Sequence, residues 1–248
     1  MDDEKLLRYS RQIMLPEVDL EGQEKLASSS VILFGLGGLG SPIAMYLAAA
    51  GVGRLVLVDH DIVELSNLQR QIIHQSNNIN DKKVLSAKES LLRLNPHVEI
   101  KPIANMFSES DFADVLPAID VLVDGTDNFK SRFEINKQSV KFSKPLVSGA
   151  ATRFEGQVGV FDGGKHDKPC YRCLYPKEGN DENNCAQNGV IAPLLGIIGS
   201  IQALETLKVL MGIGDNLCGR ILLIDALAME WQSMRLNKDE NCPECGPN

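Results

Sequence analysis

Val31-Ile-Leu-Phe-Gly35-Leu-Gly37-Gly-Leu-Gly40 joins a short apolar run to a glycine-rich turn, and an alanine-rich segment follows directly. A buried strand that passes through Gly-x-Gly-x-x-Gly into a helix offers backbone N–H groups and a helix N-terminus to a phosphate group. The pattern therefore predicts a nucleotide site. The predicted phosphate-binding residues are Gly35, Gly37, Gly38 and Gly40.

Polar residues after the next apolar run extend this site. Asp59 ends the run that begins at Leu55, about 20 residues past the glycines, where a carboxylate can meet ribose hydroxyls. Asp59 could instead cap the following turn, and Asp61 could serve the same cap. An ordinary dinucleotide site does not need the four polar residues that follow, which suggest a triphosphate and a metal ion: Asn67, Arg70, Lys83 and Asp127.

The composition argues against several classes of protein. The 248 residues carry a formal net charge of -8, which disfavours broad binding to nucleic acid or to an anionic membrane. The apolar segment from Val190 to Met211 contains Pro193, Glu205 and Lys208, so it predicts a buried helix rather than a membrane span. No N-terminal signal peptide is visible, and the six cysteines favour metal binding or catalysis over disulfides. We therefore expect a cytoplasmic protein.

Strands and helices are predicted to alternate through residues 1–150, which indicates an α/β fold of Rossmann type, with a mainly parallel sheet and helices on both faces. Residues 151–248 should extend the sheet by antiparallel strands, so that one domain spans residues 1–248. The predicted strands are Val31–Phe34, Leu55–Asp59, Glu99–Ile103, Val121–Val123, Leu146–Ser148, Gln157–Phe161, Ile221–Ile224 and Glu230–Met234. The predicted helices are Asp3–Met14, Gln23–Ala27, Ser41–Ala50, Lys83–Leu94, a short helix from Glu109, and Lys130–Phe142.

Two C-x-x-C pairs stand far apart in the sequence, Cys170 with Cys173 and Cys242 with Cys245. Each pair can present two thiolates to one ion, and four thiolates close a tetrahedron around Zn²⁺. Such a zinc knuckle has no open coordination position, so it is structural and would fasten the polar tail to the loop Gly163–Asn188. Two independent redox pairs are the alternative. Cys218 has no partner spacing, and we expect a small buried side chain there.

In this order, the motifs resemble the ThiF/MoeB family, the ubiquitin-activating-enzyme-like adenylyltransferases of sulfur carrier proteins. The resemblance covers essentially the whole chain. It rests on Arg8-Tyr-Ser-Arg11-Gln-Ile, Gly35 to Gly40, Asp59-His-Asp61, Ser66 to Gln71, Lys83, Thr126-Asp127-Asn128 and both C-x-x-C pairs. It implies that ATP adenylylates the C-terminal glycine carboxylate of a small ubiquitin-like sulfur carrier ending in Gly-Gly, with release of pyrophosphate. The acyl-adenylate would then become a thiocarboxylate.

The resemblance also implies roles for single residues. Asp59 is the expected ribose ligand, and Asn67 would contact phosphate or ribose. Arg70 and Lys83 would neutralise the β- and γ-phosphates and the departing pyrophosphate. A solvated surface position is the alternative for Lys83. Asp127 would bind Mg²⁺, a role suited to a hard oxygen donor, although Asp127 or its neighbour could simply cap the next helix.

Four further expectations concern partners and covalent chemistry. The resemblance implies that Arg11 reaches into a neighbouring subunit's site, and hence a homodimer; an exposed, salt-bridged helix face is the alternative. Cys185 matches a position that is covalently active in some relatives and dispensable in others, so a covalent role stays open. The carrier is expected to dock near Phe154 and near the segment that starts at Val190. No rhodanese-like extension follows, so we expect a separate sulfur donor.

Other functions fit the sequence less well. A Rossmann oxidoreductase would leave Arg70, Lys83 and the cysteine pairs without a purpose. A non-catalytic ATP-binding relative should have lost some of the charged residues that are present here. An adenylyltransferase for another carboxylate, such as a peptide or a modified tRNA base, is the more serious rival. Between the thiamine and molybdopterin carriers, the segments Ser148–Ala151 and Ala192–Ser200 favour the molybdopterin branch slightly.

Overall fold

One eight-stranded sheet runs through the computed structural model, which describes residues 1–164, 168–177 and 189–246. The strands are β1 (Ser30–Phe34), β2 (Arg54–Val58), β3 (Glu99–Ile103), β4 (Val121–Asp124), β5 (Leu146–Thr152), β6 (Glu155–Phe161), β7 (Arg220–Asp225) and β8 (Glu230–Arg235). Their spatial order is β3-β2-β1-β4-β5-β6-β7-β8. The first five strands in this order are parallel, and β6, β7 and β8 continue the sheet antiparallel. The predicted fold class is confirmed.

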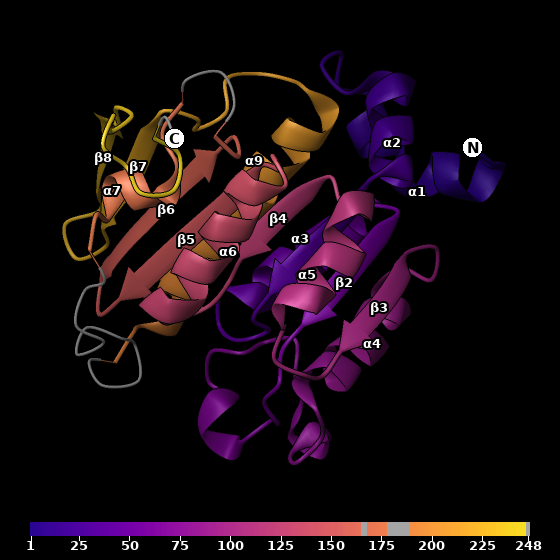
Figure 1. Cartoon of the computed structure of the whole chain (residues 1–248). Coiled ribbons are helices and arrows are strands. Elements are labelled where there is room, and N and C mark those ends of the chain that lie inside the picture. Colours follow the sequence, from indigo (N-terminus) through magenta and orange to yellow (C-terminus); the bar gives the residue numbers. More distant parts are fainter. Residues whose placement is uncertain (165–167, 178–188, 247–248) are drawn as a thin grey trace.

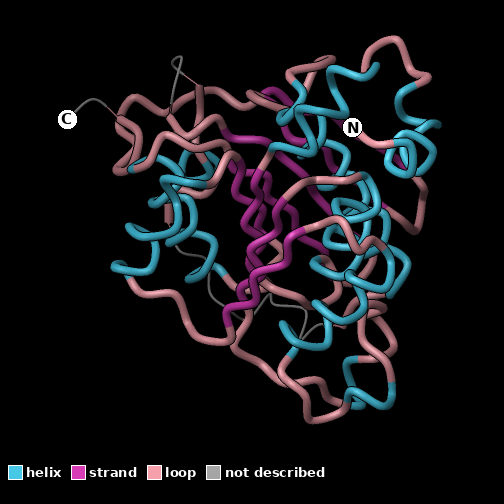
Figure 2. Tube along the Cα trace, turned by 90° about the vertical axis from the view of Figure 1, so that its right-hand side faces the viewer, coloured by secondary structure: helices cyan, strands magenta, loops and turns pink. Residues whose placement is uncertain are grey.

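Helices cover both faces of the sheet (Figures 1 and 2). They are α1 (Asp3–Ile13), α2 (Asp19–Ser28), α3 (Gly40–Ala50), α4 (Lys83–Leu94), α5 (Glu109–Val115), α6 (Phe129–Lys141), α7 (Tyr171–Leu174) and α9 (Ala192–Met211), with 3-10 turns at Leu65–Asn67, Ser76–Asn78 and Leu116–Ala118. Side chains of α2, α3, α4 and α9 pack on one face, and those of α5, α6 and α7 pack on the other.

The β1 strand, in which four apolar residues follow Ser30, shows why the sheet is central. All five of its residues are buried. Val31 and Leu33 belong to the core on the α3 and α9 side, while Ile32 and Phe34 belong to the core on the α5 and α6 side. A strand buried on both faces is the expected result of a continuous apolar run in a parallel sheet.

Several element boundaries differ from the prediction. β5 continues to Thr152 because the antiparallel partner β6 pairs with its whole length, from Leu146 with Phe161 to Thr152 with Glu155. The predicted loop Gly163–Asn188 contains the short helix α7, which the sequence pattern did not show. Asp59 lies just past β2 rather than inside it. Cys218 is only partly buried.

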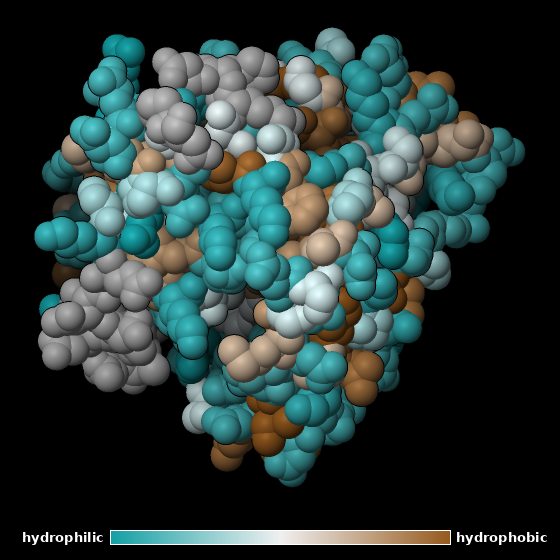
Figure 3. Space-filling model, viewed as in Figure 1, coloured by the Kyte–Doolittle hydropathy of each residue, from teal (hydrophilic) through white to brown (hydrophobic). Residues whose placement is uncertain are grey.

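Helix α9 is long and apolar enough to cross a membrane by length and composition alone. Its side chains Leu194, Ile198, Gln202 and Thr206 are buried in the molecule, and Gly199 lies against Pro42 of α3. The predicted buried helix is therefore confirmed. The face of the molecule in Figure 3 is largely hydrophilic, with apolar side chains in small separate groups.

Candidate nucleotide site

A pocket of about 320 Å³ opens at the carboxyl ends of β1, β2 and β4. Strand β2 lies on one side of β1 in the sheet, and β4 lies on the other. The pocket therefore lies at the point where the strand order reverses. Open α/β sheets bind ligands at this place. The predicted site residues that line it are Gly35, Gly37, Gly38, Asp59, Arg70, Lys83 and Asp127.

The glycine turn needs its glycines for three different reasons. Gly35 has φ +85°, a left-handed conformation that side chains rarely adopt. A Cβ on Gly40 would overlap the carbonyl oxygen of Gly35, and a Cβ on Gly38 would overlap Leu195 of α9. Gly37 has more room and faces the pocket beside the Gln71 amide. The turn therefore brings its backbone close to the space that a ligand would occupy. Gly40 itself does not line the pocket.

Asp59 is already engaged with the backbone. Its Oδ2 accepts the Leu36 N–H at 2.7 Å, and its Oδ1 accepts the Asp61 N–H at 2.9 Å. The turn-capping alternative is thus present in the structure. Each carboxylate oxygen can accept a second hydrogen bond, and Asp59 lines the pocket, so the cap leaves room for a ribose hydroxyl.

Lys83 lies in the pocket wall and its ammonium donates to Asp61 Oδ2 at 2.8 Å. The neighbouring Lys82 turns away and donates to the carbonyl of His60, so it is Lys83 that lines the pocket. Burial alone would raise the pKa of the Asp61 carboxyl, but the hydrogen bond and charge of Lys83 outweigh burial and lower that pKa. Asp61 therefore stays ionised and holds the Lys83 ammonium in position in the pocket wall.

Two predicted phosphate ligands differ in position. Arg70 lines the pocket, and its Nη1 donates to the Ser66 carbonyl at 3.0 Å. Asn67 does not line the pocket. Its side chain instead accepts the Glu64 N–H at 3.4 Å and donates to Ser66 Oγ at 3.3 Å, which closes the turn that carries Arg70. The structure gives Asn67 a supporting position.

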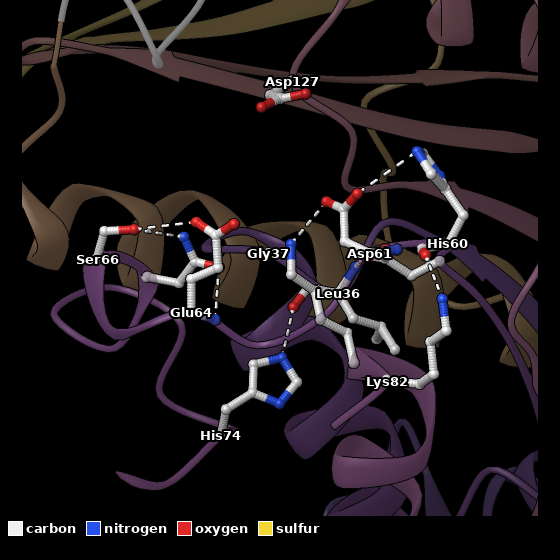
Figure 4. A network of polar contacts seen from close by, with 12 residues as sticks. Leu36, Gly37, His60, Asp61, Glu64, Ser66, His74, Lys82 and Asp127 are labelled. Carbon is white, nitrogen blue, oxygen red and sulfur yellow. Dashed lines mark hydrogen bonds and ion pairs between the residues drawn. The ribbon is translucent and has the colours of Figure 1, made fainter. Parts of the chain in front are cut away.

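Asp127 and Asn128 take different positions at the start of α6. Asn128 caps α6, because its Oδ1 accepts the Ser131 N–H at 2.9 Å. Asp127 is exposed and lines the pocket, on the opposite side from Gly37 and Asp61 (Figure 4). Its Oδ1 accepts a hydrogen bond from Asn128 Nδ2 at 3.4 Å. An exposed carboxylate that faces the glycine turn is a suitable donor for a hard cation such as Mg²⁺.

A buried ion pair behind this loop was not predicted. Arg132 of α6 lies 3.7 Å from Asp124 at the end of β4, and both side chains are buried. Burial is the largest influence and alone would lower the pKa of Arg132, but Asp124, Tyr171 and Tyr175 together outweigh it and raise that pKa. Arg132 Nη2 also donates to the Thr126 carbonyl at 2.9 Å. The spacing of Arg132 on α6 gave no sign of its partner, because that partner comes from a strand.

A second unpredicted residue supports the glycine turn from below. The buried His74 ring contacts the Leu36 carbonyl through Nε2 at 3.1 Å (Figure 4). Its Nδ1 lies 2.9 Å from Ser86 Oγ. A carbonyl can only accept, so we assign the proton to Nε2 and the role of acceptor to Nδ1. Burial, together with the charge of Lys83, lowers the pKa of His74 despite the opposing hydrogen bond to Leu36. A neutral imidazole thus links the turn to α4.

An aromatic wall closes one side of the pocket. Phe34, Phe107 and Phe112 lie with ring centroids 4.9 to 5.7 Å apart, and all three line the pocket beside Met106. Phe34 belongs to β1, whereas the other two follow β3 in the sequence. Sequence reasoning missed this wall because apolar residues near a strand end look like ordinary core.

Four thiols meet at the other end of α6. We call them the tetracysteine cluster: Cys170, Cys173, Cys242 and Cys245. Cys170 Sγ lies 3.6 Å from Cys242 Sγ, and Cys173 Sγ lies 3.5 Å from Cys245 Sγ. Four thiolates around Zn²⁺ at about 2.3 Å would stand about 3.8 Å apart, so the donor set fits that ion. Burial and the neighbouring sulfurs raise the pKa of the Cys170 thiol, which a bound cation would reverse.

The family model of the ThiF family matches residues 9–244. The chain belongs to the ThiF family. It is similar to two proteins named molybdopterin-synthase adenylyltransferase: that of Escherichia coli K12, 43% identical over 99% of this chain and 98% of the relative, and that of Haemophilus influenzae, 46% identical over 95% and 97%. It is also similar to the ThiS sulfur-carrier adenylyltransferase of Escherichia coli K12, 42% identical over 99% and 97%.

Solved structures agree on the fold of this ThiF-family chain. The microcin C7 biosynthetic enzyme MccB in complex with N-formylated MccA has a TM-score of 0.84 at 22% identity, over 96% of this chain and 75% of that one. Escherichia coli MccB with ATP has a TM-score of 0.80 at 23% identity, and covers 92% and 70%. At such identities the likeness concerns the fold alone.

Arg11 is a further predicted residue of the ThiF-family chain that does not line the pocket. Arg11 is exposed on α1, which packs at the far end of α3: Gln12 donates to the Ala50 carbonyl at 3.1 Å. Since α3 begins at the glycine turn, its eleven residues put about 16 Å between α1 and the pocket. Cys185 lies outside the described residues.

Proposed function

We propose that the chain adenylylates the C-terminal glycine carboxylate of a ubiquitin-like sulfur carrier protein, using ATP and releasing pyrophosphate. This step would prime the carrier for conversion to a thiocarboxylate. One observation carries the proposal: the glycine turn, the carboxylate of Asp59, the cations of Arg70 and Lys83, and the carboxylate of Asp127 all face a single pocket. The relatives are named as adenylyltransferases of molybdopterin synthase and of the sulfur carrier ThiS, which supports the same proposal.

The pocket residues suit this chemistry. A carboxylate attacks a triphosphate poorly, because both carry negative charge, so the site must cancel charge and align the attack. Backbone N–H groups of the Gly35–Gly40 turn would cradle phosphate oxygens. Arg70 and Lys83 would neutralise the β- and γ-phosphates and the departing pyrophosphate, and Asp59 would hold the ribose.

Asp127 would hold Mg²⁺ against the phosphates. The fit rests on the positions of the two residues: Asn128 supplies the helix cap, so the Asp127 carboxylate is not used for capping and lines the pocket, with only a long hydrogen bond from Asn128 Nδ2 to its Oδ1 at 3.4 Å. The ion would withdraw charge from the phosphate oxygens. The tetracysteine cluster would hold Zn²⁺ in a closed, structural site, with no share in the reaction.

The carrier would dock beside the pocket mouth. The residues after β5 and before α9 meet there through their backbones. The Arg153 carbonyl accepts the Ile191 N–H at 3.1 Å, and the Arg153 N–H donates to the Gly189 carbonyl at 2.8 Å. Phe154 and Ile191 are partly exposed, whereas Val190 lines the pocket. A Gly-Gly tail would reach the α-phosphate past Val190. Unchanged carrier affinity after Phe154→Asp would contradict this docking site.

Arg11 would complete the pocket of a second copy in a homodimer. Its own pocket lies beyond the opposite end of α3, and three exposed apolar side chains lie near it, Leu7 on α1 and Met14 and Leu15 just after α1, with exposed fractions of 77%, 70% and 50%. Mixing Arg11→Ala protein with Lys83→Ala protein, each inactive alone, should restore about one quarter of the wild-type rate, because half of the dimers would contain one intact site. No recovery, although mixed dimers are shown to form, would contradict an Arg11 that acts in the partner's pocket.

The proposed reaction is tested by ATP–pyrophosphate exchange with Mg²⁺ and a purified carrier. We expect exchange only with a carrier that keeps its terminal glycine. The relatives are nearly equal in identity for the molybdopterin and thiamine carriers, and we favour the molybdopterin carrier from the segments Ser148–Ala151 and Ala192–Ser200. Comparing both carriers decides the pathway. ATP binding without exchange on either carrier would direct the search to another carboxylate, such as a peptide.

We further propose one domain, a cytoplasmic location and a separate sulfur donor. The single sheet that contains strands of both halves supports the first point. The five cysteines of the described residues form no disulfide, which fits a reducing compartment. A covalent role of Cys185 stays a prediction, to be tested by Cys185→Ser in an assay of thiocarboxylate formation.

A further inference from the structure

Helix α6 contacts the nucleotide pocket and the tetracysteine cluster at once. Its first two turns line the pocket with Lys130, Ser131, Arg132, Glu134 and Ile135. We propose that α6 couples the two regions, with Arg132 and Asn136 as positioning residues, so that metal in the tetracysteine cluster strengthens nucleotide binding. The inference rests on the proposed function only for the identity of the nucleotide.

The cysteine end of the coupling is Asn136. Its side chain is fully buried. Its Oδ1 accepts the Tyr171 N–H at 2.8 Å, and its Nδ2 donates to Cys170 Sγ at 3.6 Å. A buried amide that loses such partners leaves a polar group unsatisfied, which is costly. The position of α6 is therefore tied to the position of the first C-x-x-C pair.

Ring contacts along the same side of α6 reinforce this link. Phe133 packs edge-on against Tyr171, with ring centroids 5.8 Å apart, and the Arg172 guanidinium lies 4.3 Å above the Phe133 ring. Phe129 packs edge-on against Tyr175 at 5.4 Å. Since α7 spans the residues between Cys170 and Cys173, displacement of those cysteines would displace the rings that pack on α6.

The pocket end of the coupling is Arg132, one turn before Asn136 and on the same face of the helix. Arg132 holds the Thr126 carbonyl at 2.9 Å and pairs with Asp124. Asp124 Oδ1 in turn accepts both the Thr126 N–H at 2.9 Å and the Thr126 hydroxyl at 2.6 Å. Thr126 precedes Asp127, so this network fixes the loop that presents the Asp127 carboxylate.

The consequence is a physical path of direct contacts. Cys170 of the cluster contacts Asn136, and Asn136 also accepts the Tyr171 N–H. Asn136 belongs to α6, so these contacts hold the helix in position. Arg132, on the same helix, holds the loop that precedes Asp127. Loss of the metal would allow Cys170 and Cys173 to move, and with them the residues of α7 that contact α6. Nucleotide held through Asp127 would then bind more weakly, because the loop would have to be ordered on binding.

The test measures Mg²⁺-ATP affinity by calorimetry on the full chain, before and after a chelator has removed tightly bound metal and Mg²⁺ has been restored. Mass spectrometry follows zinc content and circular dichroism follows the fold. We expect metal removal to weaken Mg²⁺-ATP binding by about tenfold, within the usual range of coupling between sites. Asn136→Ala should weaken it by about fivefold with zinc still present, and chelation should then change little.

Gln138→Ala is the matched control, a buried amide on the same helix whose Nε2 donates to Glu134 of α6 itself at 2.7 Å. It should respond to chelation as the wild type does. If Asn136→Ala fails to fold, Phe133→Leu takes its place, because it removes the ring contacts and keeps apolar volume.

An affinity that chelation leaves unchanged in the wild type would overturn the coupling. So would an Asn136→Ala protein whose Mg²⁺-ATP affinity falls on chelation by as much as that of the wild type. If Mg²⁺-ATP affinity depends on the metal but no carrier-dependent exchange occurs, the proposed function is refuted and the coupling stands. No Mg²⁺-ATP binding at all would refute both.

Discussion

The nucleotide pocket and the tetracysteine cluster both gather residues from distant parts of the chain, but different forces assemble them. Strands β1, β2 and β4 are almost completely buried, so apolar packing brings the pocket residues to one edge of the sheet. At the cluster, four thiols meet beside a polar tail with little apolar surface. The pocket should therefore keep its shape without a ligand, whereas the cluster should depend on an ion.

The largest effect is expected from breaking the cluster. Cys242→Ser should abolish binding of about one zinc per chain, because it removes one of the four thiolates. The effect should be large, since such sites contribute on the order of 10 kcal/mol of metal-binding free energy. The tail after β8 should then be cut early in limited proteolysis. Metal analysis and mass spectrometry of the fragments measure both effects. Cys218→Ser serves as the control, and a chain that keeps zinc after Cys242→Ser would contradict the four-ligand site.

The next largest effect concerns the buried ion pair behind the pocket. Arg132→Met should lower the free energy of unfolding by about 3–5 kcal/mol, because Asp124 would stay buried without its partner. Urea denaturation measures the loss. The double variant Arg132→Met with Asp124→Asn should recover part of it, and a single variant as stable as the wild type would show that packing alone holds α6.

A smaller effect should appear with pH. Burial lowers the pKa of His74, so the unfolded chain binds a proton below about pH 6.5 that the folded chain does not bind. Stability should therefore fall as the pH drops from 7.5 toward 5, with a slope from this group of at most about 1.4 kcal/mol per pH unit. His74→Gln should reduce the slope measured by urea denaturation. An equal slope in both proteins would mean that other groups cause the loss.

The smallest effect on stability is expected at the pocket surface. Lys83→Met breaks the pair with Asp61, whose side chain is 53% exposed, so unfolding should change by less than about 1 kcal/mol. Mg²⁺-ATP affinity should nevertheless fall by at least about tenfold, because a phosphate partner is lost. Calorimetry and urea denaturation on one sample separate the two effects. Lys82→Met is the matched control and should leave affinity unchanged.

The sequence predicted those parts of the molecule in which local pattern and tertiary packing agree. The continuous apolar runs became the central strands, Lys83–Leu94 has the predicted bounds, and the four cysteines meet as their spacing indicated. The site was harder to predict. Asn67 has the expected residue type, yet its amide closes its own turn, and sequence does not show which way a side chain points.

Contacts across the sheet were not predictable for a related reason. The Arg132 to Asp124 pair joins a helix to a strand, and the wall of Phe34, Phe107 and Phe112 joins two strand ends. Each residue alone looks like surface charge or core. Helical spacing shows which residues share a face, but only the packed structure shows what that face meets.

The separation of the two cysteine pairs gives the cluster a further effect. Cys170 and Cys242 are 72 positions apart, and the chain between them contains α9, β7 and β8. An unfolded chain would rarely bring two such distant pairs together, so the ion would bind the folded chain and leave the unfolded one. Its binding free energy would then add to the free energy of unfolding. The stability of the whole sheet would thus depend on the concentration of free zinc, even for strands that touch no cysteine.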